Sequence, residues 1–504
     1  MLEKTLQPKQ SPKEARQMEK RMTRRQALGA VGGLLASAVL VACAPGPTPT
    51  PQVIVKEVTK VVEVEKEKVV EKPVEKVVTQ VVEKVVKETV APPQRTKITY
   101  LHFHSDVVRV GAQDLLVGNY NRDSLKYVVE PVFVPFGELT QKWEAALASG
   151  EPFDILLSSG MDAGRMGMEK KALNLDAYWD ASKKLPPATP ENWVPYTILE
   201  LSGVVYQGKK YGVPFQPDTR FLFLDVKAFK EVGLDPEKPP VTWDDLWTYA
   251  DKLDKGKKGA WQRIGFCPVW GQSWFWMWLW SMGWCEWDQQ NEFKASVMDR
   301  PEVRECIQWH IAWRDRYGRD DLNALAAGFT GLVDAFITGM NPILVHGSWM
   351  PARYKVVKPA FEIAYAMFPR HPGKNGRHSS WGAGHCMVIA PNSKHPDGAW
   401  DFIEWFLSAE NMKLWCTKTG TFVGRADVMN DPDVQKAHPH YKIAFEQLKL
   451  TNPCPTPVPY PGADYRGAML LVWDGKATID EALKQKQEEA NQAVQDWIKT
   501  HPGQ

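Results

Sequence analysis

The chain has 504 residues, which is long enough for two or three domains with large hydrophobic cores. Its formal net charge is +2, but residues 1–42 hold an excess of basic side chains, so the remainder is slightly acidic. This charge balance argues against a nucleic-acid partner. The sequence also lacks HExxH, GxSxG, CxxC and phosphate-loop motifs, so it offers no catalytic signature, metal site or cofactor site.

Residues 1–42 have the pattern of an export signal. Arg24 and Arg25 precede an apolar run rich in Gly and Ala, which ends in the sequence LVAC at 40–43. The run is about 16 residues long, too short for a stable transmembrane helix. The pattern predicts a twin-arginine lipoprotein signal peptide, with lipidated Cys43 as the mature N-terminus at a membrane surface. A single uncleaved anchor helix is the alternative.

Residues 43–95 are predicted to be a linker because their composition differs from that of both neighbours. A Pro- and Thr-rich start is followed by a low-complexity tract of Val, Lys and Glu at 53–90. Several of its valines recur at spacings of three and four, which would suit a helical stalk. However, Val is a mediocre helix former and Pro73 interrupts the tract, so we expect an extended or partly helical spacer.

From Thr96 the pattern changes to alternating strands and helices. Such a β-α-β-α-β order predicts a doubly wound α/β lobe whose strands are mostly parallel. In these sheets ligands bind beyond the carboxyl ends of the strands, which is where His104, Glu138 and Asp162 stand. The expected strands lie at 97–103, 127–134 and 153–157, and the expected helices at 107–119 and 136–149.

The stretch at 211–253 combines a strand with two short helices. The apolar run at 221–224 predicts a strand buried on both faces. Asp225 is expected to cap the helix that follows, and Thr242 with Asp245 predicts a capping-box start for the next helix. Further strands are expected at 342–346, 361–368 and within 379–390, and a further helix at 397–407.

This stretch resembles the family 1 extracellular solute-binding proteins of ABC importers, whose members carry a YGxP, strand, GL and PPxTWDDL block. Later segments keep the family order, with SKHPxxAWxF at 393–402, a TG turn at 419–420 and GxxxxxEAL at 475–483, so the resemblance covers about residues 96–498. The matching positions of the first block are Tyr211, Gly212, Pro214, Gly233, Leu234, Pro240, Thr242, Trp243, Asp244, Asp245 and Leu246.

The resemblance implies an α/β fold of the periplasmic-binding-protein type, class II, in which crossing strands hinge two lobes. Residues 96–218 with 384–425 would form the N-terminal lobe, and residues 219–383 with 426–504 the C-terminal lobe. The lobes would close around a ligand, and ligand contacts from both lobes would stabilise the closed form. A membrane permease would recognise that closed form.

Tryptophan is unusually abundant, with 22 residues against 19 Phe and 14 Tyr. A sugar ring presents an apolar C–H face and a rim of hydroxyls, so its site needs aromatic platforms beside planar polar groups. The resemblance places Trp349 where the sugar-binding members stack an aromatic ring on ligand. It places Trp381 at the second crossing, where the floor of the cleft is expected.

The aromatic block at 270–284 holds four alternating tryptophans, at 274, 276, 278 and 280. In a strand they would share one face, whereas in a helix Trp274 would pair with Trp278 and Trp276 with Trp280. We expect most of them in the core, and either Trp274 or Trp276 at the cleft.

Polar candidates come from the strand ends, the first crossing and the segment before the last helix. The resemblance implies that Asp218 and Arg220 face ligand, although they could instead pair with each other as a salt bridge at the hinge. It also places Arg466 where some sugar-binding relatives carry a ligand-binding Arg, with Tyr460 or Tyr465 as the nearby aromatic. The full set is His104, Asp162, Asp218, Arg220, Tyr460 and Arg466, with Glu138 and Arg425 as weaker candidates.

Six cysteines besides Cys43 permit disulfides in an exported protein, with 15 possible connectivities. Cys267 with Cys285 is the first pairing to consider, because the separation is short. Other cysteines could remain buried thiols in a domain with an adequate core. His438 and His440 flank a proline and could bind a metal, but an isolated pair of this kind is not expected to.

Together these features predict a monomeric ABC-importer lipoprotein at the outer face of the cytoplasmic membrane. It would capture a mono- or oligosaccharide and deliver it to a permease, without catalysis, cofactor or metal. Glycerol phosphate or a polyol is an alternative ligand within the same fold. Two further alternatives are a glycan-degrading enzyme, which needs two carboxylates about 5 to 10 Å apart, and a structural surface protein on a stalk.

Overall fold

The computed structural model describes residues 94–284, 298–329, 334–452 and 464–501. The predicted signal peptide, Cys43 and nearly all of the predicted linker lie outside these residues. The chain divides into two units, Met1–Gln94 and Arg95–Gln504, and every feature below belongs to the second. Among the helices of the described residues, none combines the length and the apolar character that crossing a membrane requires.

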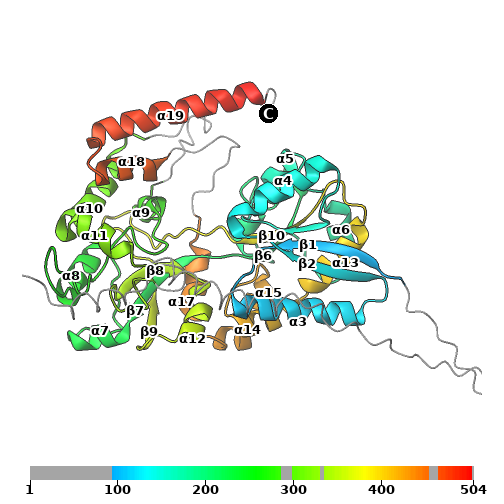
Figure 1. The fold of residues 1–504 in the computed structure, drawn as a ribbon, viewed down its shortest axis with the longest axis horizontal. Coiled ribbons are helices and arrows are strands. Elements are labelled where there is room, and N and C mark those ends of the chain that lie inside the picture. The colour runs from blue at the N-terminus through cyan, green and yellow to red at the C-terminus, as the bar shows by residue number, and fades with distance from the viewer. Residues whose placement is uncertain (1–93, 285–297, 330–333, 453–463, 502–504) are drawn as a thin grey trace, which may run out of the picture. The chain divides into compact units, whose positions relative to one another are not determined.

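The first sheet has five strands in the order β2-β1-β3-β10-β6 (Figure 1). β1 pairs in parallel with β2 and with β3, as predicted, whereas β10 runs antiparallel to β3 and to β6. Ile98, Leu156 and Val388 are buried on three of these strands, so the sheet carries the core of this part of the molecule. The strands are β1 (Thr96–His102), β2 (Tyr127–Phe133), β3 (Ile155–Leu157), β6 (Val213–Gln216) and β10 (His385–Ile389).

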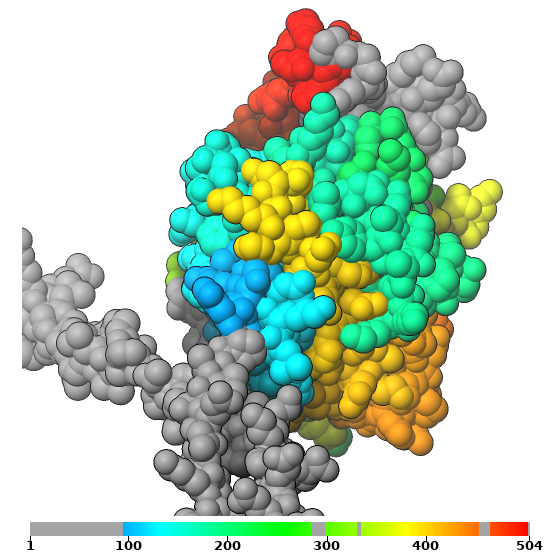
Figure 2. Space-filling model, turned by 90° about the vertical axis from the view of Figure 1, so that its right-hand side faces the viewer, coloured from blue at the N-terminus to red at the C-terminus, as the bar shows by residue number. Residues whose placement is uncertain are grey.

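Helices connect and cover this sheet. α3 (Val107–Asp123) starts after Asp106, whose side chain accepts a hydrogen bond from the Arg109 N–H at 2.9 Å. It continues beyond the predicted end at residue 119, because Tyr120 is buried and donates a hydrogen bond to Asp401 at 2.6 Å. α13 (Pro396–Phe406) carries Asp401 and packs on α3 and β1, and Figure 2 shows this yellow segment beside the blue and cyan ones.

The second sheet has three strands, with β7 (Arg220–Asp225) between β8 (Ile343–Gly347) and β9 (Ile363–Ala366) and antiparallel to both. The predicted buried strand is confirmed, since residues 221–224 are each 0% exposed. α17 (Tyr441–Lys449) packs on β7 and β9 and contributes to this burial. β9 is shorter than the strand predicted at 361–368.

Both predicted helix starts after β7 are confirmed. The Asp225 side chain accepts a hydrogen bond from the Ala228 N–H at 3.0 Å and caps α7 (Val226–Glu231). Thr242 and Asp245 form a capping box at the start of α8 (Trp243–Leu253). Each cap satisfies backbone donors that a helix leaves unpaired at its N-terminus, which is why short local sequence is enough to predict it.

The remaining elements are mainly helical. The helix predicted at 136–149 begins as a 3-10 turn, η1, before α4 takes over. These elements are η1 (Phe136–Glu138), α4 (Leu139–Ser149), α5 (Ala163–Met168), α6 (Asp176–Ala181), η2 (Pro195–Ile198), β4 (Val205–Tyr206), β5 (Lys209–Lys210), α9 (Phe275–Ser281), α10 (Pro301–Tyr317), α11 (Arg319–Ala326), α12 (Met350–Val357), α14 (Ala409–Thr419), α15 (Ala426–Met429), α16 (Pro432–Lys436), α18 (Tyr465–Trp473) and α19 (Ile479–Thr500).

The chain passes from the first sheet to the second between β6 and β7, and it returns between β9 and β10. The two passages are joined at Ser380, whose hydroxyl accepts from the Arg220 N–H at 3.1 Å and donates to the Arg220 carbonyl at 2.7 Å. The Thr219 and Thr451 hydroxyls lie 2.5 Å apart and add a third segment. Three segments that are distant in sequence therefore meet between the sheets.

The cysteines in the described residues are buried thiols. Cys267 is free, so the bridge considered from Cys267 to Cys285 is not formed, and Cys285 itself lies outside the described residues. Burial raises the pKa of the Cys267 thiol to about 12, which keeps it protonated and unreactive. The other free cysteines are Cys306, Cys386 and Cys416.

Candidate ligand-binding site

Arg220 lies against two tryptophans where the chain passes between the sheets. Its guanidinium carbon is 4.2 Å from the ring centroid of Trp381 and 4.9 Å from that of Trp349. Arg220 opens β7, Trp349 follows β8 at the start of α12, and Trp381 belongs to the return passage. Three residues that the sequence singled out separately are thus brought together, and both rings remain partly exposed.

Trp274 and Trp276 extend this group. Their rings stack with centroids 5.3 Å apart and an interplanar angle of 12°. The centroid of the Trp381 ring lies 5.8 Å from that of Trp274 and 5.9 Å from that of Trp276, in edge-to-face contacts. Of the two arrangements that the sequence left open, the helical one holds from Phe275, where α9 begins, and Trp274 precedes the helix in an extended conformation. Trp278 and Trp280 are buried in the core, as expected for most of the block.

Arg466 completes the group from α18. Its guanidinium carbon lies 4.9 Å from the ring centroid of Trp274, and the residue is exposed. We call these residues the tryptophan–arginine cluster: Trp274, Trp276, Trp349, Trp381, Arg220 and Arg466. The cluster draws on α9, α12, β7, α18 and the return passage, so only the tertiary fold assembles it.

Asp218 pairs with Arg220 across a short distance. The Arg220 Nη1 donates to Asp218 Oδ1 at 2.5 Å, and the side chains are 4% and 13% exposed respectively. The same Asp218 oxygen accepts the Ala383 N–H at 2.8 Å. The salt bridge that the sequence left as the alternative to ligand contact is therefore present, and Asp218 ties it to the return passage through Ala383. Contact of either residue with ligand stays a prediction.

Two glycines allow the close approaches in this region. A Cβ on Gly347 would come within 2.1 Å of the Trp349 ring, so that ring lies directly on the backbone of β8. A Cβ on Gly382 would come within 1.8 Å of the Asp218 carbonyl oxygen. Glycine is the residue that lets a backbone be approached in this way. The sequences GSW at 347–349 and WG at 381–382 are the signals for these contacts.

His104 stands apart from the cluster. It is 1% exposed, with Nδ1 3.0 Å from Gln113 Oε1 and Nε2 2.9 Å from Gln216 Oε1. The Gln216 amide continues to the Thr421 hydroxyl at 3.0 Å, which also accepts the Trp415 indole N–H at 2.8 Å. Burial is the main cause that lowers the pKa of His104 to about 3. Its proposed ligand contact stays a prediction from sequence.

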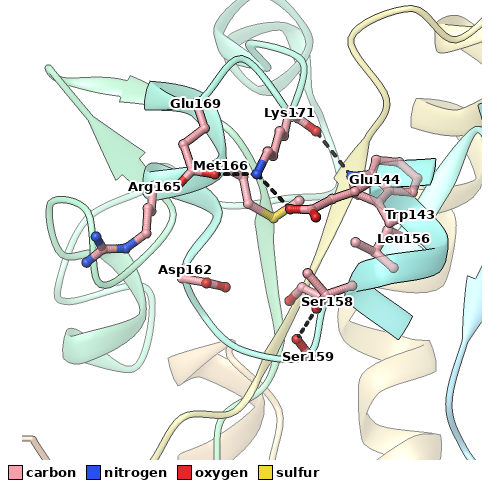
Figure 3. Close-up of a pocket in the computed structure, with 11 residues that line it drawn as sticks. Trp143, Glu144, Leu156, Ser158, Ser159, Asp162, Arg165, Met166, Glu169 and Lys171 are labelled. Carbon is pink, nitrogen blue, oxygen red and sulfur yellow. Dashed lines mark hydrogen bonds and ion pairs between the residues drawn. The ribbon is translucent and has the colours of Figure 1, made fainter. Parts of the chain in front are cut away.

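Asp162 lies at a different place again. It precedes α5 and lines a cavity of about 80 Å³ between α4, the end of β3 and α5 (Figure 3). Lys171 closes one side of this cavity through ion pairs to Glu144 at 2.6 Å and Glu169 at 2.7 Å. Within the described residues Asp162 forms no hydrogen bond or ion pair with the tryptophan–arginine cluster, and its contact with ligand stays a prediction.

The weaker candidates have local roles. Glu138 belongs to η1. Arg425 is buried and binds Asp427 with Nε and Nη2 at 3.0 and 2.7 Å, and its Nη1 donates to the Lys184 carbonyl at 2.6 Å. His438 and His440 donate from Nε2 to the backbone carbonyls of Cys416 and Gly420 at the end of α14. Tyr460 lies outside the described residues.

Two residues beside the cluster were missed from the sequence. The Tyr196 hydroxyl donates to the Asp218 carbonyl at 2.8 Å and so supports the hinge salt bridge. His346, on β8, lies 5.9 Å from the Trp349 ring. Burial, and then the charge of Arg220, lower the pKa of His346 to about 3. The position of His346 directly before GSW was the available signal.

A family model described as bacterial extracellular solute-binding protein matches residues 110–413, which is more than half of the chain. Among curated proteins, the sn-glycerol-3-phosphate-binding periplasmic protein of Escherichia coli is 24% identical over 79% of this chain and 93% of its own length. The maltotriose-binding protein of Pyrococcus abyssi is 22% identical over 71% of each chain.

Solved structures share the fold. CpMnBP1 with mannotriose bound has a TM-score of 0.65 at 23% identity, over 79% of this chain and 100% of that one. The cyclic α-maltosyl-1,6-maltose-binding protein of Arthrobacter globiformis has a TM-score of 0.61 at 21% identity, over 80% and 100%. These similarities show the two-lobe α/β fold that the sequence predicted.

Proposed function

Because the chain belongs to the bacterial extracellular solute-binding protein family, we propose that it is the extracytoplasmic substrate-binding lipoprotein of an ABC importer. Its ligand would be a mono- or oligosaccharide, held where the chain passes between the two sheets. The observation that carries this proposal is the tryptophan–arginine cluster, which gathers four partly exposed tryptophan rings at these passages. Such surfaces suit the C–H faces of sugar rings.

The polar groups beside the rings suit a hydroxyl-rich ligand. Asp218 uses one carboxylate oxygen for Arg220 and Ala383, and no residue of the described part of the chain donates to its other oxygen, Oδ2. A sugar hydroxyl could donate to that oxygen while the ring stacks on Trp349 or Trp381.

The passages supply the hinge for closure. We keep the lobe boundaries as part of the proposal, with residues 96–218 and 384–425 in one lobe and residues 219–383 and 426–504 in the other. They are supported by the division of the strands, since β1, β2, β3, β6 and β10 pair in one sheet and β7, β8 and β9 in another. A ligand that contacts both lobes favours the closed form, which the permease would recognise.

The location of the protein rests on its N-terminal sequence. Lipidated Cys43 would hold a monomer at the outer face of the cytoplasmic membrane, and residues 43–95 would space the binding lobes from it. Catalysis is not part of the proposal. In the described residues Asp218 is the only carboxylate that hydrogen-bonds to a cluster member, whereas glycoside hydrolysis needs two.

Glycerol phosphate is the second candidate ligand. It is favoured by the similarity to the Escherichia coli protein and by the two arginines of the cluster. Its phosphate would pair with guanidinium groups, but a three-carbon ligand would leave most of the tryptophan surface without a partner.

Thermal unfolding of the full-length protein against sugars, polyols and glycerol phosphates tests the proposal. A ligand at 100 times its dissociation constant adds about 2.7 kcal/mol to the free energy of unfolding, so the binding sugar should raise Tm by several degrees. The shift should disappear in Trp349→Ala and persist in Trp247→Ala, which removes a partly buried tryptophan outside the cluster. No shift with any saccharide would overturn the carbohydrate assignment.

A further inference from the structure

Arg220 is a buried cation with one edge that lacks partners. Its Nη1 donates to Asp218 Oδ1 at 2.5 Å and lies 3.4 Å from the Trp381 carbonyl. Its Nε is buried and has no hydrogen-bond partner, and no residue in the described ranges accepts from Nη2. A buried donor without an acceptor costs free energy, so this arrangement calls for an explanation.

Arg263 shares part of this feature, since its Nη2 is buried without a partner, but its Nε donates to the Leu253 carbonyl at 2.6 Å. Two further arginines have a carboxylate at the Nε and Nη2 edge. Arg316 donates from Nε and Nη2 to Asp254 at 3.1 and 2.5 Å, and its Nη1 pairs with Asp251 at 2.6 Å. Arg425 uses the same Nε and Nη2 edge to bind Asp427. In both, a carboxylate lies across the edge that Arg220 leaves open.

The Nε and Nη2 edge has a specific chemical preference. Its two N–H groups are nearly parallel and match the two oxygens of a carboxylate or phosphate, which form a bidentate pair with it. The rings of Trp349 and Trp381 hold the guanidinium plane at 4.9 and 4.2 Å and Asp218 holds Nη1, so the open edge is already oriented. A preorganised donor pair loses little conformational entropy when an anion binds.

A neighbouring donor points to the same ligand chemistry. The indole N–H of Trp276 is buried without a hydrogen-bond partner, and its ring lies 5.9 Å from Trp381, the ring on which Arg220 stacks. Charge adds to this, because Arg220 and Arg466 bring two positive charges to the cluster and Asp218 brings one negative charge. The site therefore has an excess of donors and of positive charge.

We propose that the ligand carries an anionic group, a carboxylate or a phosphate monoester, which Arg220 binds through Nε and Nη2. The inference rests on the proposed function for the presence of a ligand in the tryptophan–arginine cluster, and it narrows the ligand to an acidic saccharide or a phosphorylated sugar or polyol. The tryptophan rings would take the apolar faces of the same ligand, and the anion would sit across the open edge of Arg220.

Calorimetric titration of the full-length protein with matched ligand pairs tests this. The pairs are digalacturonate with its dimethyl ester, glucuronate with glucose, glucose 6-phosphate with glucose, and glycerol 3-phosphate with glycerol. The charged member of at least one pair should bind about 30-fold more tightly, in line with a charge-assisted bidentate hydrogen bond. If only the carboxylate pairs show this preference, the anionic group is a carboxylate, and if only the phosphate pairs show it, the group is a phosphate monoester.

The variant Arg220→Lys separates bidentate binding from charge alone. It keeps the positive charge but removes the parallel donors, so it should remove most of the preference for the charged member. Arg316→Lys is the matched control, because Arg316 is also stacked on tryptophan, and it should keep the preference. Equal loss in both variants would overturn the proposal.

The outcomes also separate this inference from the proposed function. If neutral saccharides bind as tightly as charged ones, the carbohydrate assignment stands and the proposal of an anionic group on the ligand is wrong. If glycerol 3-phosphate binds and no saccharide does, the proposal of an anionic group stands and the carbohydrate assignment is wrong. If the folded protein binds no member of any pair, both are wrong. The wild-type comparison does not depend on whether a variant folds.

Discussion

Arg220 and Arg316 are both stacked on tryptophan, and they differ in what surrounds the edges of their guanidinium groups. Arg316 lies 4.8 Å from the Trp247 ring, a distance close to the 4.9 Å between Arg220 and Trp349. Arg316 has aspartates across its edges, whereas Arg220 has one aspartate and one open edge. Stacking on tryptophan therefore does not identify a binding site, and the pairing of the remaining donors does.

The positions of the two arginines explain the difference. Arg316 is on α10 and pairs with Asp251 and Asp254 at the end of α8, so it fastens two neighbouring helices. Arg220 stands where the chain passes between the two sheets, among segments that must move if the lobes close. A fully paired arginine suits the first place, and a group kept for ligand suits the second.

The largest expected difference between the two arginines is in how much their removal lowers the free energy of unfolding. Arg316→Met removes both N–H donors to Asp254 Oδ2 and the ion pair to Asp251, so the free energy of unfolding should fall by about 3 kcal/mol. Arg220→Met should cost about 1 kcal/mol, because fewer bonds are lost. Urea denaturation measures both. A larger loss in Arg220→Met than in Arg316→Met would contradict the comparison.

The tryptophans stacked on the two arginines should differ in their effect on ligand affinity. Trp349→Ala should weaken ligand binding about 30-fold, or about 2 kcal/mol, because the ring that stacks on ligand is lost. Trp247→Ala should leave affinity within about twofold while reducing stability. Calorimetric titration with the ligand found by thermal screening measures this. Equal losses of affinity would mean that the cluster is not the site.

A smaller change tests the position of the Trp349 ring. In Gly347→Ala the new methyl group would occupy the place of that ring, so the ring must move, and affinity should fall about tenfold. Gly118→Ala on α3 is the control, since a Cβ there meets nothing within 4 Å. It should leave affinity unchanged and raise stability by up to about 1 kcal/mol. Unchanged affinity in Gly347→Ala would show that the ring position does not matter.

The smallest expected effect is on His346. Burial and then Arg220 hold its pKa at about 3, below the usual 6.5, so its unfolded form binds a proton first as pH falls and stability decreases between about pH 6.5 and 3. Arg220→Met should raise this pKa, though not to 6.5, because burial remains. Arg316→Met should not change it. Histidine resonances followed by NMR through a pH titration measure the shift, and an unchanged pKa in Arg220→Met would contradict the proximity.

The sequence by itself determined those strands and helix starts that depend on interactions between residues close together in the chain. The apolar run at 221–224 predicted β7 because a strand covered on both faces needs apolar side chains throughout. Asp225 and Thr242 predicted helix starts because a cap acts within three residues. The order of motifs along the chain predicted the two-lobe fold. GSW and WG indicated where Trp349 and Trp381 stand.

Only the tertiary structure decided how these residues meet. Sequence placed His104 and Arg220 alike among ligand candidates, yet one is enclosed by hydrogen-bond partners and the other keeps an open edge. It left open whether the tryptophans at 274–280 lie in a strand or in a helix, whereas the start of α9 sets Trp274 against Trp276. The physical reason is that some partners come from segments more than a hundred residues away, as Gln216 does for His104 and Trp381 for Arg220, and no local pattern records which of them arrives.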